Sequence, residues 1–100
     1  MSEWKSASVV IRHEVGLHAR PSVKLTKLAK GFVSAIEIAG SADGPWIDAK
    51  SIVKVMAMKA KQGSMLHLRA VGSDAAAAVA ALKILVEHDF DEDKVDAASG

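Results

Sequence analysis

The sequence predicts an α+β domain in which amphipathic helices cover one face of an antiparallel sheet. Two observations carry this prediction. Four short segments are rich in β-branched residues or alternate apolar and polar residues, whereas three others space their apolar residues as helices do. Their order along the chain is β-α-β-β-α-β-α, and 100 residues, half of them hydrophobic, suffice for one domain with a single small core.

The first half of the pattern is a strand followed by a helix. In residues 6–13 apolar and polar residues largely alternate, which predicts a strand. A turn at residues 14–16 leads to a predicted helix over residues 19–30, ended by Gly31, which accepts the left-handed conformation of a C-cap. One predicted helix face consists of Ser22, Leu25, Thr26 and Ala29, and another of Arg20, Val23, Lys27 and Lys30.

Two strands and a short helix come next. Residues 32–39 are rich in β-branched residues, residues 40–45 are dense in turn formers, and residues 46–49 return as a short third strand. Ser51 is placed to cap a short helix. The β-branched residues that follow Ser51 would by themselves favour a strand, so the sequence leaves helix and strand open over residues 50–58.

The last strand and helix have the clearest patterns. Residues 65–71 alternate, and residues 72–74 are expected to cap a helix that runs from Ala75 to Glu87 or His88. From residue 89 on, the chain is charged and then small and polar, which predicts a frayed or disordered end. The core side of the strand is expected to be Leu66, Leu68 and Ala70, and that of the helix Val79, Leu82, Leu85 and Val86.

The net charge of +1 hides an asymmetry. Residues 87–96 contain six acidic residues and one lysine; removing these from the totals of 12 and 13 leaves residues 1–86 with six acidic and 12 basic residues, a net charge of +6. A basic body favours acidic proteins, phosphate groups or nucleic acid. The four aromatic residues are spread out and provide no stacking platform for bases, so we expect no nucleic-acid partner.

Other function classes are excluded by what the sequence lacks. It contains no cysteine, hence no disulfide, no thiolate metal site and no cysteine nucleophile. Its longest apolar stretch, residues 75–86, is interrupted by Lys83 and is too short to cross a bilayer, and the first eight residues do not form a signal peptide. We therefore expect a cytoplasmic protein that does not insert into membranes.

The strongest functional signal is the stretch Gly-Leu-His-Ala-Arg-Pro at residues 16–21. Pro21 suits the first turn of a helix, because its missing N–H would have no partner there. His18 would then stand at the helix N-terminus, where backbone N–H groups and the helix dipole favour an anion. With Arg20 beside it, the imidazole is suited to carry a phosphoryl group. A histidine that merely caps or packs at a turn is the other interpretation, and the residues alone leave both open.

Three other histidines, His13, His67 and His88, are candidates for the same role. None of them precedes an Arg-Pro helix start. A metal site would need two or more histidines with a carboxylate in one place, and neither the H-x-x-x-H nor the H-x-x-E spacing occurs. We expect no metal, and nothing in the sequence indicates another cofactor.

Ser51 also has two interpretations. It is either a helix cap or a phosphorylation target at a helix start, where added negative charge is tolerated. The apolar residues after it belong either to the core or to an exposed contact patch. Lys27, Lys30 and Lys54 are either a solvated surface or, if the two helices lie side by side, the rim of the His18 site, where they would attract an acidic partner.

Three stretches together resemble a known family. Residues 16–21, the Lys-Gly-Phe at residues 30–32 and the Asp-Ala-Lys-Ser-Ile-Val-Lys at residues 48–54 are similar in order and spacing to HPr, the histidine-containing phosphocarriers of the bacterial phosphoenolpyruvate:sugar phosphotransferase system. The capped helix after Gly72 matches too. The resemblance covers about residues 8–87.

The resemblance implies an open-faced β-sandwich, with four antiparallel strands covered on one face by three helices. It implies that His18 accepts a phosphoryl group at Nδ1 from phosphorylated enzyme I and passes it to a histidine of an enzyme IIA-type protein, with Arg20 stabilising the phosphorylated state. Such a protein is a monomeric carrier, a substrate of phosphotransferases rather than an enzyme.

The resemblance further implies a partner-binding face and a regulatory site. Ser51 matches a serine that an HPr kinase/phosphorylase modifies in some lineages. A mainly regulatory, nitrogen-type member that acts by phosphorylation-dependent protein binding is the alternative to a sugar-transport carrier. The positions that match the partner-binding face are Val23, Lys27, Lys30, Ile52, Val53, Lys54 and Met56.

The chain departs from the family pattern in three places. The connection at residues 40–46 is longer than usual, and we expect it not to touch the site. Val15 stands where many members have a polar turn residue. The acidic residues 89–96 continue beyond the usual end, so we divide the chain into an HPr-like domain (residues 1–88) and a flexible acidic tail (residues 89–100).

Overall fold

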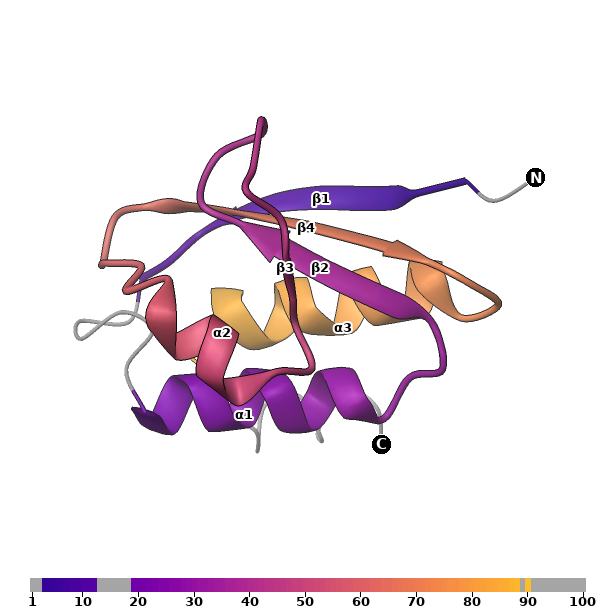
Figure 1. Cartoon of the computed structure of the whole chain (residues 1–100), viewed down its shortest axis with the longest axis horizontal. Coiled ribbons are helices and arrows are strands. Elements are labelled where there is room, and N and C mark those ends of the chain that lie inside the picture. The colour runs from indigo at the N-terminus through magenta and orange to yellow at the C-terminus, as the bar shows by residue number, and fades with distance from the viewer. Residues whose placement is uncertain (1–2, 13–18, 89, 91–100) are drawn as a thin grey trace.

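One antiparallel sheet with three helices on one side forms the fold (Figure 1). The computed structural model describes residues 3–12, 19–88 and 90. The sheet order is β1-β4-β2-β3. This is the α+β architecture that the sequence predicts. The strands are β1 (Lys5–Val10), β2 (Ala35–Ala39), β3 (Ile47–Asp48) and β4 (Met65–Val71), and the helices are α1 (Ala19–Lys30), α2 (Ile52–Ala57) and α3 (Ala75–Glu87).

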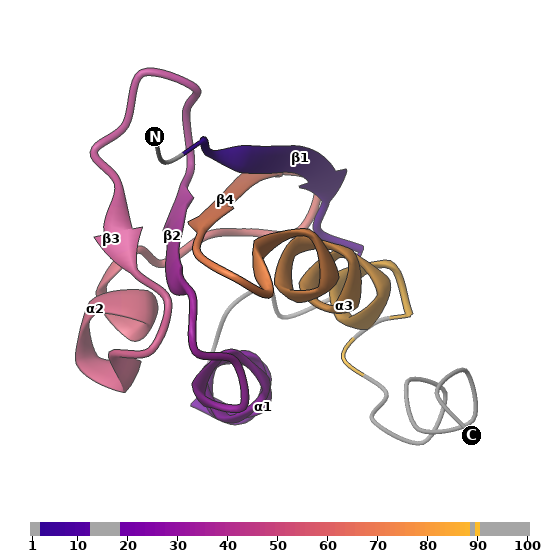
Figure 2. The same cartoon turned by 90° about the vertical axis from the view of Figure 1, so that its right-hand side faces the viewer.

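Figure 2 shows the three helices on one side of the sheet. The core lies between the sheet and these helices. Alternation within β4 buries every second side chain on the helix side of the sheet. The residues expected on the inner faces of α1 and α3 are all buried, and α2 contributes Val55. The largest fully buried side chains include Leu25, Ile36, Ile38, Leu66, Leu68, Leu82 and Leu85.

Three strands are shorter than predicted, and β3 covers only Ile47–Asp48 rather than residues 46–49. β1 ends at Val10 rather than at residue 13, because the backbone of Ile11 pairs with the turn residues Gly63 and Ser64. His13 itself lies outside the described residues. β2 begins at Ala35 rather than at residue 32, because the N–H groups of the two preceding residues bind a side chain instead of a neighbouring strand.

That side chain is Asp74, which stands at the N-cap of α3. It makes no side-chain capping bond, contrary to the prediction that residues 72–74 cap the helix. Its carboxylate accepts hydrogen bonds from Val33 N–H (3.0 Å), Ser34 N–H (2.9 Å) and the Ser34 hydroxyl (2.5 Å) instead. The start of α3 is thereby tied to the segment between α1 and β2.

The end of α1 differs from the prediction in one detail. The helix stops at Lys30 as predicted, and Gly31 N–H donates to Leu28 C=O over 3.1 Å. Gly31 does not adopt a left-handed conformation, however. The close of the helix is therefore a tightened turn rather than a glycine C-cap.

The face of the sheet away from the helices is polar and internally paired. Arg69 of β4 lies opposite Glu37 of β2, and its Nε donates to the Glu37 carboxylate over 2.8 Å. The same guanidinium lies over the rings of Trp4 (4.4 Å) and Trp46 (4.1 Å), one before β1 and one before β3. Charge pairing and cation–π contacts thus hold both tryptophans on the sheet.

Phe90 belongs to the packed body, although the sequence places it in the acidic tail. Its side chain is 1% exposed and lies in the core cluster. Its N–H donates to Leu85 C=O over 2.7 Å, so the residue is bonded to the last turn of α3. Its carbonyl accepts from Lys24 Nζ over 2.9 Å. The division at residue 88 stays a prediction, because residues 91–100 lie outside the described part of the chain.

We expect Gly72→Ala to destabilise the protein much more than Gly63→Ala. Both glycines have positive φ, but a Cβ on Gly63 would meet nothing within 4 Å, whereas one on Gly72 would lie 2.5 Å from Ser34 Oγ and 2.8 Å from Ser34 Cα. The Gly63 variant should lose about 1 kcal/mol in free energy of unfolding from backbone strain alone. Urea denaturation measures both losses, and equal losses would contradict tight packing between Gly72 and Ser34.

We expect Asp74→Asn to change the pH dependence of stability. The hydrogen bonds from the Ser34 side chain and then from Val33 N–H lower the pKa of Asp74 below its ordinary value of 3.8. Its carboxylate therefore stabilises the fold above pH 3.8, and this contribution is lost as the pH falls through the lower, folded pKa.

The stability gap between the parent and Asp74→Asn should thus be full at neutral pH and close under acid conditions. Urea denaturation over a pH series measures it. Asp43→Asn, in the exposed connection before β3, is the control and should keep the pH profile of the parent. A gap for Asp74→Asn that does not vary with pH would contradict the role given to the carboxylate.

Candidate functional site

One face of α1 is exposed and basic. The helix carries four basic residues and no acidic one. Arg20, Val23, Lys27 and Lys30, which the sequence assigns to one face, are all exposed, because the opposite face is packed into the core. A shallow, wide-open depression of about 600 Å³ lies on this face, and we call it the basic cleft; its described lining residues are Ala19, Arg20, Val23, Lys24 and Lys27.

The segment after Ser51 is a helix, which settles one of the choices that the sequence leaves open. Ser51 has extended backbone angles, and its Oγ accepts from Lys54 N–H over 3.4 Å, so it is the N-cap of α2. Burial of Val55 holds the helix on the core. Val53 and Met56 face outward and are 74% and 41% exposed, so they lie on the surface rather than in the core.

The helices α1 and α2 lie side by side and contact each other (Figure 2). The structure therefore brings the candidate residues of both helices onto neighbouring elements. Ser51 and Ile52, at the start of α2, are half-buried. The exposed candidates are Arg20, Val23, Lys27, Lys30, Val53, Lys54 and Met56.

His18 and Val15 lie outside the described residues, so the structure does not test the histidine assignment directly. In the sequence His18 comes directly before Ala19, where α1 begins, and Pro21 is buried in the first turn of the helix. The predicted helix start beside the histidine is thus observed. The first turn of such a helix has N–H groups without partners inside the helix, together with the positive end of the dipole.

The other described histidines have different surroundings. The Nδ1 of His67 lies 3.0 Å from Ser8 Oγ on the open face of the sheet, away from the helices. His88 is exposed at the C-cap of α3. Neither stands before the first turn of a helix. Among residues 3–12, 19–88 and 90, no group of three or more His, Cys, Asp or Glu side chains is arranged to hold a metal ion.

The cations near the basic cleft have no carboxylate partner in the described part of the chain. The only ion pair there is Arg69 with Glu37, on the opposite side of the sheet. Lys24 donates to the Phe90 carbonyl, which is neutral. Among the described residues the cleft therefore has positive charge without a carboxylate partner, which favours an anion or an acidic segment or protein.

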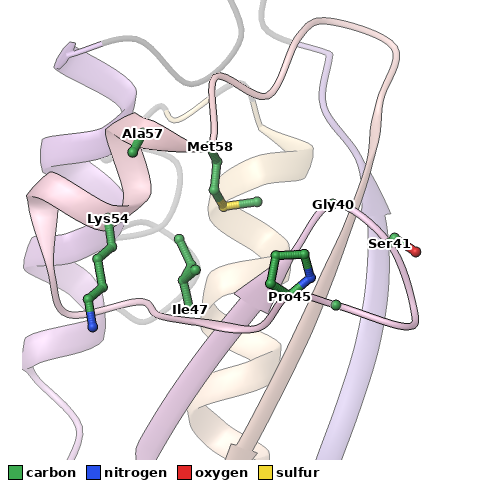
Figure 3. Close-up of a pocket in the computed structure, with 8 residues that line it drawn as sticks. Gly40, Ser41, Pro45, Ile47, Lys54, Ala57 and Met58 are labelled. Atoms are coloured by element: carbon green, nitrogen blue, oxygen red, sulfur yellow. The ribbon is translucent and has the colours of Figure 1, made fainter.

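The long connection at residues 40–46 lies beside Lys54, one residue of the candidate face; the prediction that it does not touch the His18 site stays a prediction, because His18 lies outside the described residues. With the end of α2 it borders an open pocket of about 470 Å³, which Lys54 helps to line. Figure 3 shows Ile47 and Met58 between α2 and this connection. The connection joins the end of β2 to the start of β3. Nothing in its own sequence indicates that it packs beside α2.

Lys24 is a further lining residue of the basic cleft, and it is not among the candidates predicted from the sequence. It lines the basic cleft and holds the carbonyl of Phe90. Its spacing of four residues from Arg20 and three from Lys27 is a signal that it lies beside both on the helix. Its contact with Phe90, 66 residues away, has no signal in the local pattern.

The chain is similar in sequence to known phosphocarrier proteins. The family model described as "PTS HPr component phosphorylation site" matches residues 5–88. The chain belongs to the HPr family. The phosphocarrier protein HPr of Cupriavidus necator is 44% identical over 82 residues, which are 82% of this chain and 90% of that protein. The phosphocarrier protein NPr of Proteus mirabilis is 34% identical over 85% of this chain and 93% of that protein.

Solved structures agree with this membership. An HPr structure from Thermoanaerobacter tengcongensis superimposes with a TM-score of 0.79 at 35% identity, covering 86% of this chain and 94% of that one. Membership supports a phosphocarrier role in the phosphotransferase system, in a family of phosphoryl carriers rather than catalysts. Within the described residues, no helix is long and apolar enough to span a membrane.

Proposed function

We propose that this chain carries a phosphoryl group on His18 between two other proteins. Nδ1 of the neutral imidazole attacks the phosphorus of phosphorylated enzyme I, and the P–N bond to the enzyme I histidine breaks. A histidine of an enzyme IIA-type protein later takes the group from His18 by the same exchange. The observation that supports this most is the start of α1 at Ala19, directly after the histidine, in a chain that belongs to the HPr family.

Arg20 is proposed to hold the phosphoryl oxygens. It is exposed in the first turn of α1 and lines the basic cleft. A guanidinium offers two parallel hydrogen bonds to a phosphate, and these strengthen when both partners are charged. The helix start adds backbone N–H groups without partners inside the helix and a dipole that favours negative charge.

The docking surface for both partners is proposed to be the exposed side of α1 and α2. It combines apolar side chains (Val23, Val53 and Met56) with the cations of Lys27, Lys30 and Lys54, and Ile52 lies at its half-buried edge. An acidic partner with an apolar centre fits such a surface. The protein acts as a monomer, because one copy supplies the histidine, the arginine and the docking surface.

Ser51 is proposed as a second, regulatory phosphorylation site, modified by an HPr kinase/phosphorylase. Its hydroxyl caps α2, and the next three residues all belong to the docking surface. A phosphoserine there would bring negative charge beside Lys54 and change the charge that a partner meets. Similarity to an NPr protein supports a second candidate role, in which the same exchange serves nitrogen-type regulation rather than sugar transport.

Enzyme I and phosphoenolpyruvate should transfer one phosphoryl group to the protein, in a linkage that is labile to acid and stable to base. His18→Ala should abolish the label, because no other described histidine stands before a helix start. Ser51→Ala is the matched control and should keep the acid-labile label. Phosphate analysis of the three proteins measures this; a label that persists in His18→Ala, or that the parent never acquires, contradicts the proposal.

Arg20→Ala should slow transfer by about tenfold to a hundredfold, the effect of losing one charge-assisted hydrogen bond to the phosphoryl group. The melting temperature should stay as in the parent, because the side chain is exposed. Lys5→Ala removes an exposed cation at the start of β1 and is the control, with the rate of the parent. Rapid-quench measurement of phosphoryl transfer tests both, and an Arg20→Ala variant that transfers at the parental rate would remove Arg20 from the site.

A further inference from the structure

The chain leaves the packed body beside the basic cleft. Phe90 is buried, its N–H is bonded to Leu85 at the end of α3, and its carbonyl is held by Lys24 Nζ at 2.9 Å. Lys24 is also a lining residue of the cleft. The last described residue is thus fixed against the surface that the proposed partners use, and the next residue starts from there.

The ten residues that follow begin with a strongly acidic segment. Residues 91–96 read Asp-Glu-Asp-Lys-Val-Asp, four carboxylates and one ammonium group, for a net charge of −3. Six extended residues span up to about 20 Å. Along α1, Arg20 lies about 6 Å and Lys30 about 9 Å from Lys24, at 1.5 Å per residue. The acidic segment is long enough to reach every cation on the exposed face of the helix.

We propose that the acidic segment, residues 91–96, binds the basic cleft of its own chain and competes there with acidic partner proteins. Charge complementarity supports this occupant, because α1 contributes four cations and no carboxylate, and no described ion pair neutralises them. Tethering at Phe90 gives the segment an effective concentration in the millimolar range, so a weak contact suffices to populate the bound form.

The competition is expected to be weak and to depend on salt. Exposed ion pairs are individually weak and are screened by salt, so a partner with a larger complementary surface displaces the segment. The segment therefore lowers the rate of productive docking without blocking it, most strongly at low ionic strength. Partners that bind the cleft only weakly compete less well with the segment, so the difference in docking between weak and strong partners increases. The competition rests on the proposed function of the docking surface; the contact within the chain does not.

The test uses the full chain with two carboxylates neutralised, Glu92→Gln/Asp93→Asn. The control is Glu3→Gln/Asp43→Asn, which raises the net charge equally but at exposed positions away from α1. Amide NMR shifts of Arg20, the cation of the cleft that lies farthest along the sequence from Phe90, report occupancy of the cleft. They should change in the first variant and not in the control, and the difference should vanish at about 0.5 M salt, where charges beyond a few ångströms are screened.

Transfer rates give a second readout. With enzyme I at low salt, kcat/KM of Glu92→Gln/Asp93→Asn should exceed that of the parent by about twofold to fivefold, through a lower KM, since two of several weak ion pairs are removed. The control variant should match the parent. Enzyme I from a source whose docking surface is acidic is the probe, and the rise should shrink as salt is added.

The outcomes separate the two proposals. Unchanged Arg20 shifts in the tail variant would overturn the contact. Shifts that depend on protein concentration would assign the segment to a second copy and overturn the intramolecular form. Changed shifts with equal transfer rates would overturn the competition. Changed shifts in a protein that enzyme I never phosphorylates would leave the contact standing and contradict the proposed function instead.

Discussion

The carboxylate of Asp74 joins parts of the chain that are far apart in sequence. It stands at the start of α3 and accepts hydrogen bonds from Val33 and Ser34, forty residues earlier. Gly72 reaches the same place with a positive φ and lies so close to Ser34 that no side chain fits between them. The end of β4, the start of α3 and the start of β2 therefore meet at one point.

This junction also affects the position of α1 and therefore which of its faces is exposed. The helix ends at Lys30, three residues before Val33. Because Val33 and Ser34 are held by Asp74, the position of the C-terminal end of α1 relative to the sheet is restricted. The inner face of α1 then packs onto the core through Leu25 and Ala29. With that side buried, helical spacing leaves the lysines and Arg20 no position except the outer face. The basic cleft is thus a consequence of the same packing that holds the core.

Local patterns sufficed wherever local contacts decide the structure. The bounds of α1 and β4 follow from periodicity, and Ser51 was recognisable as a cap from its type and place. The β-branched run after Ser51 became helical because burial of Val55 outweighs strand propensity.

Other features have no local signal. The start of β2 depends on Asp74, the end of β1 on the turn at Ser64, and the place of Phe90 on Lys24. Each of these bonds joins residues tens of positions apart, so no sequence window contains both partners. The same holds for the connection at residues 40–46, whose position beside Lys54 follows from tertiary packing. The histidine assignment stays a prediction, because His18 lies outside the described residues.

Positive charge is paired on one side of the sheet and not paired among the described residues on the other, and this difference supports the proposed phosphoryl site. On the open face, Arg69 is paired with Glu37 and lies against two tryptophan rings. An incoming phosphoryl group there would have to displace a carboxylate that already satisfies the guanidinium. On the helix side, Arg20 and Lys27 line a cleft with no carboxylate among its described residues. An anion that arrives there gains attraction without breaking an existing pair. The pairing of Arg69 on the open face therefore supports the start of α1 as the proposed place for an anionic group.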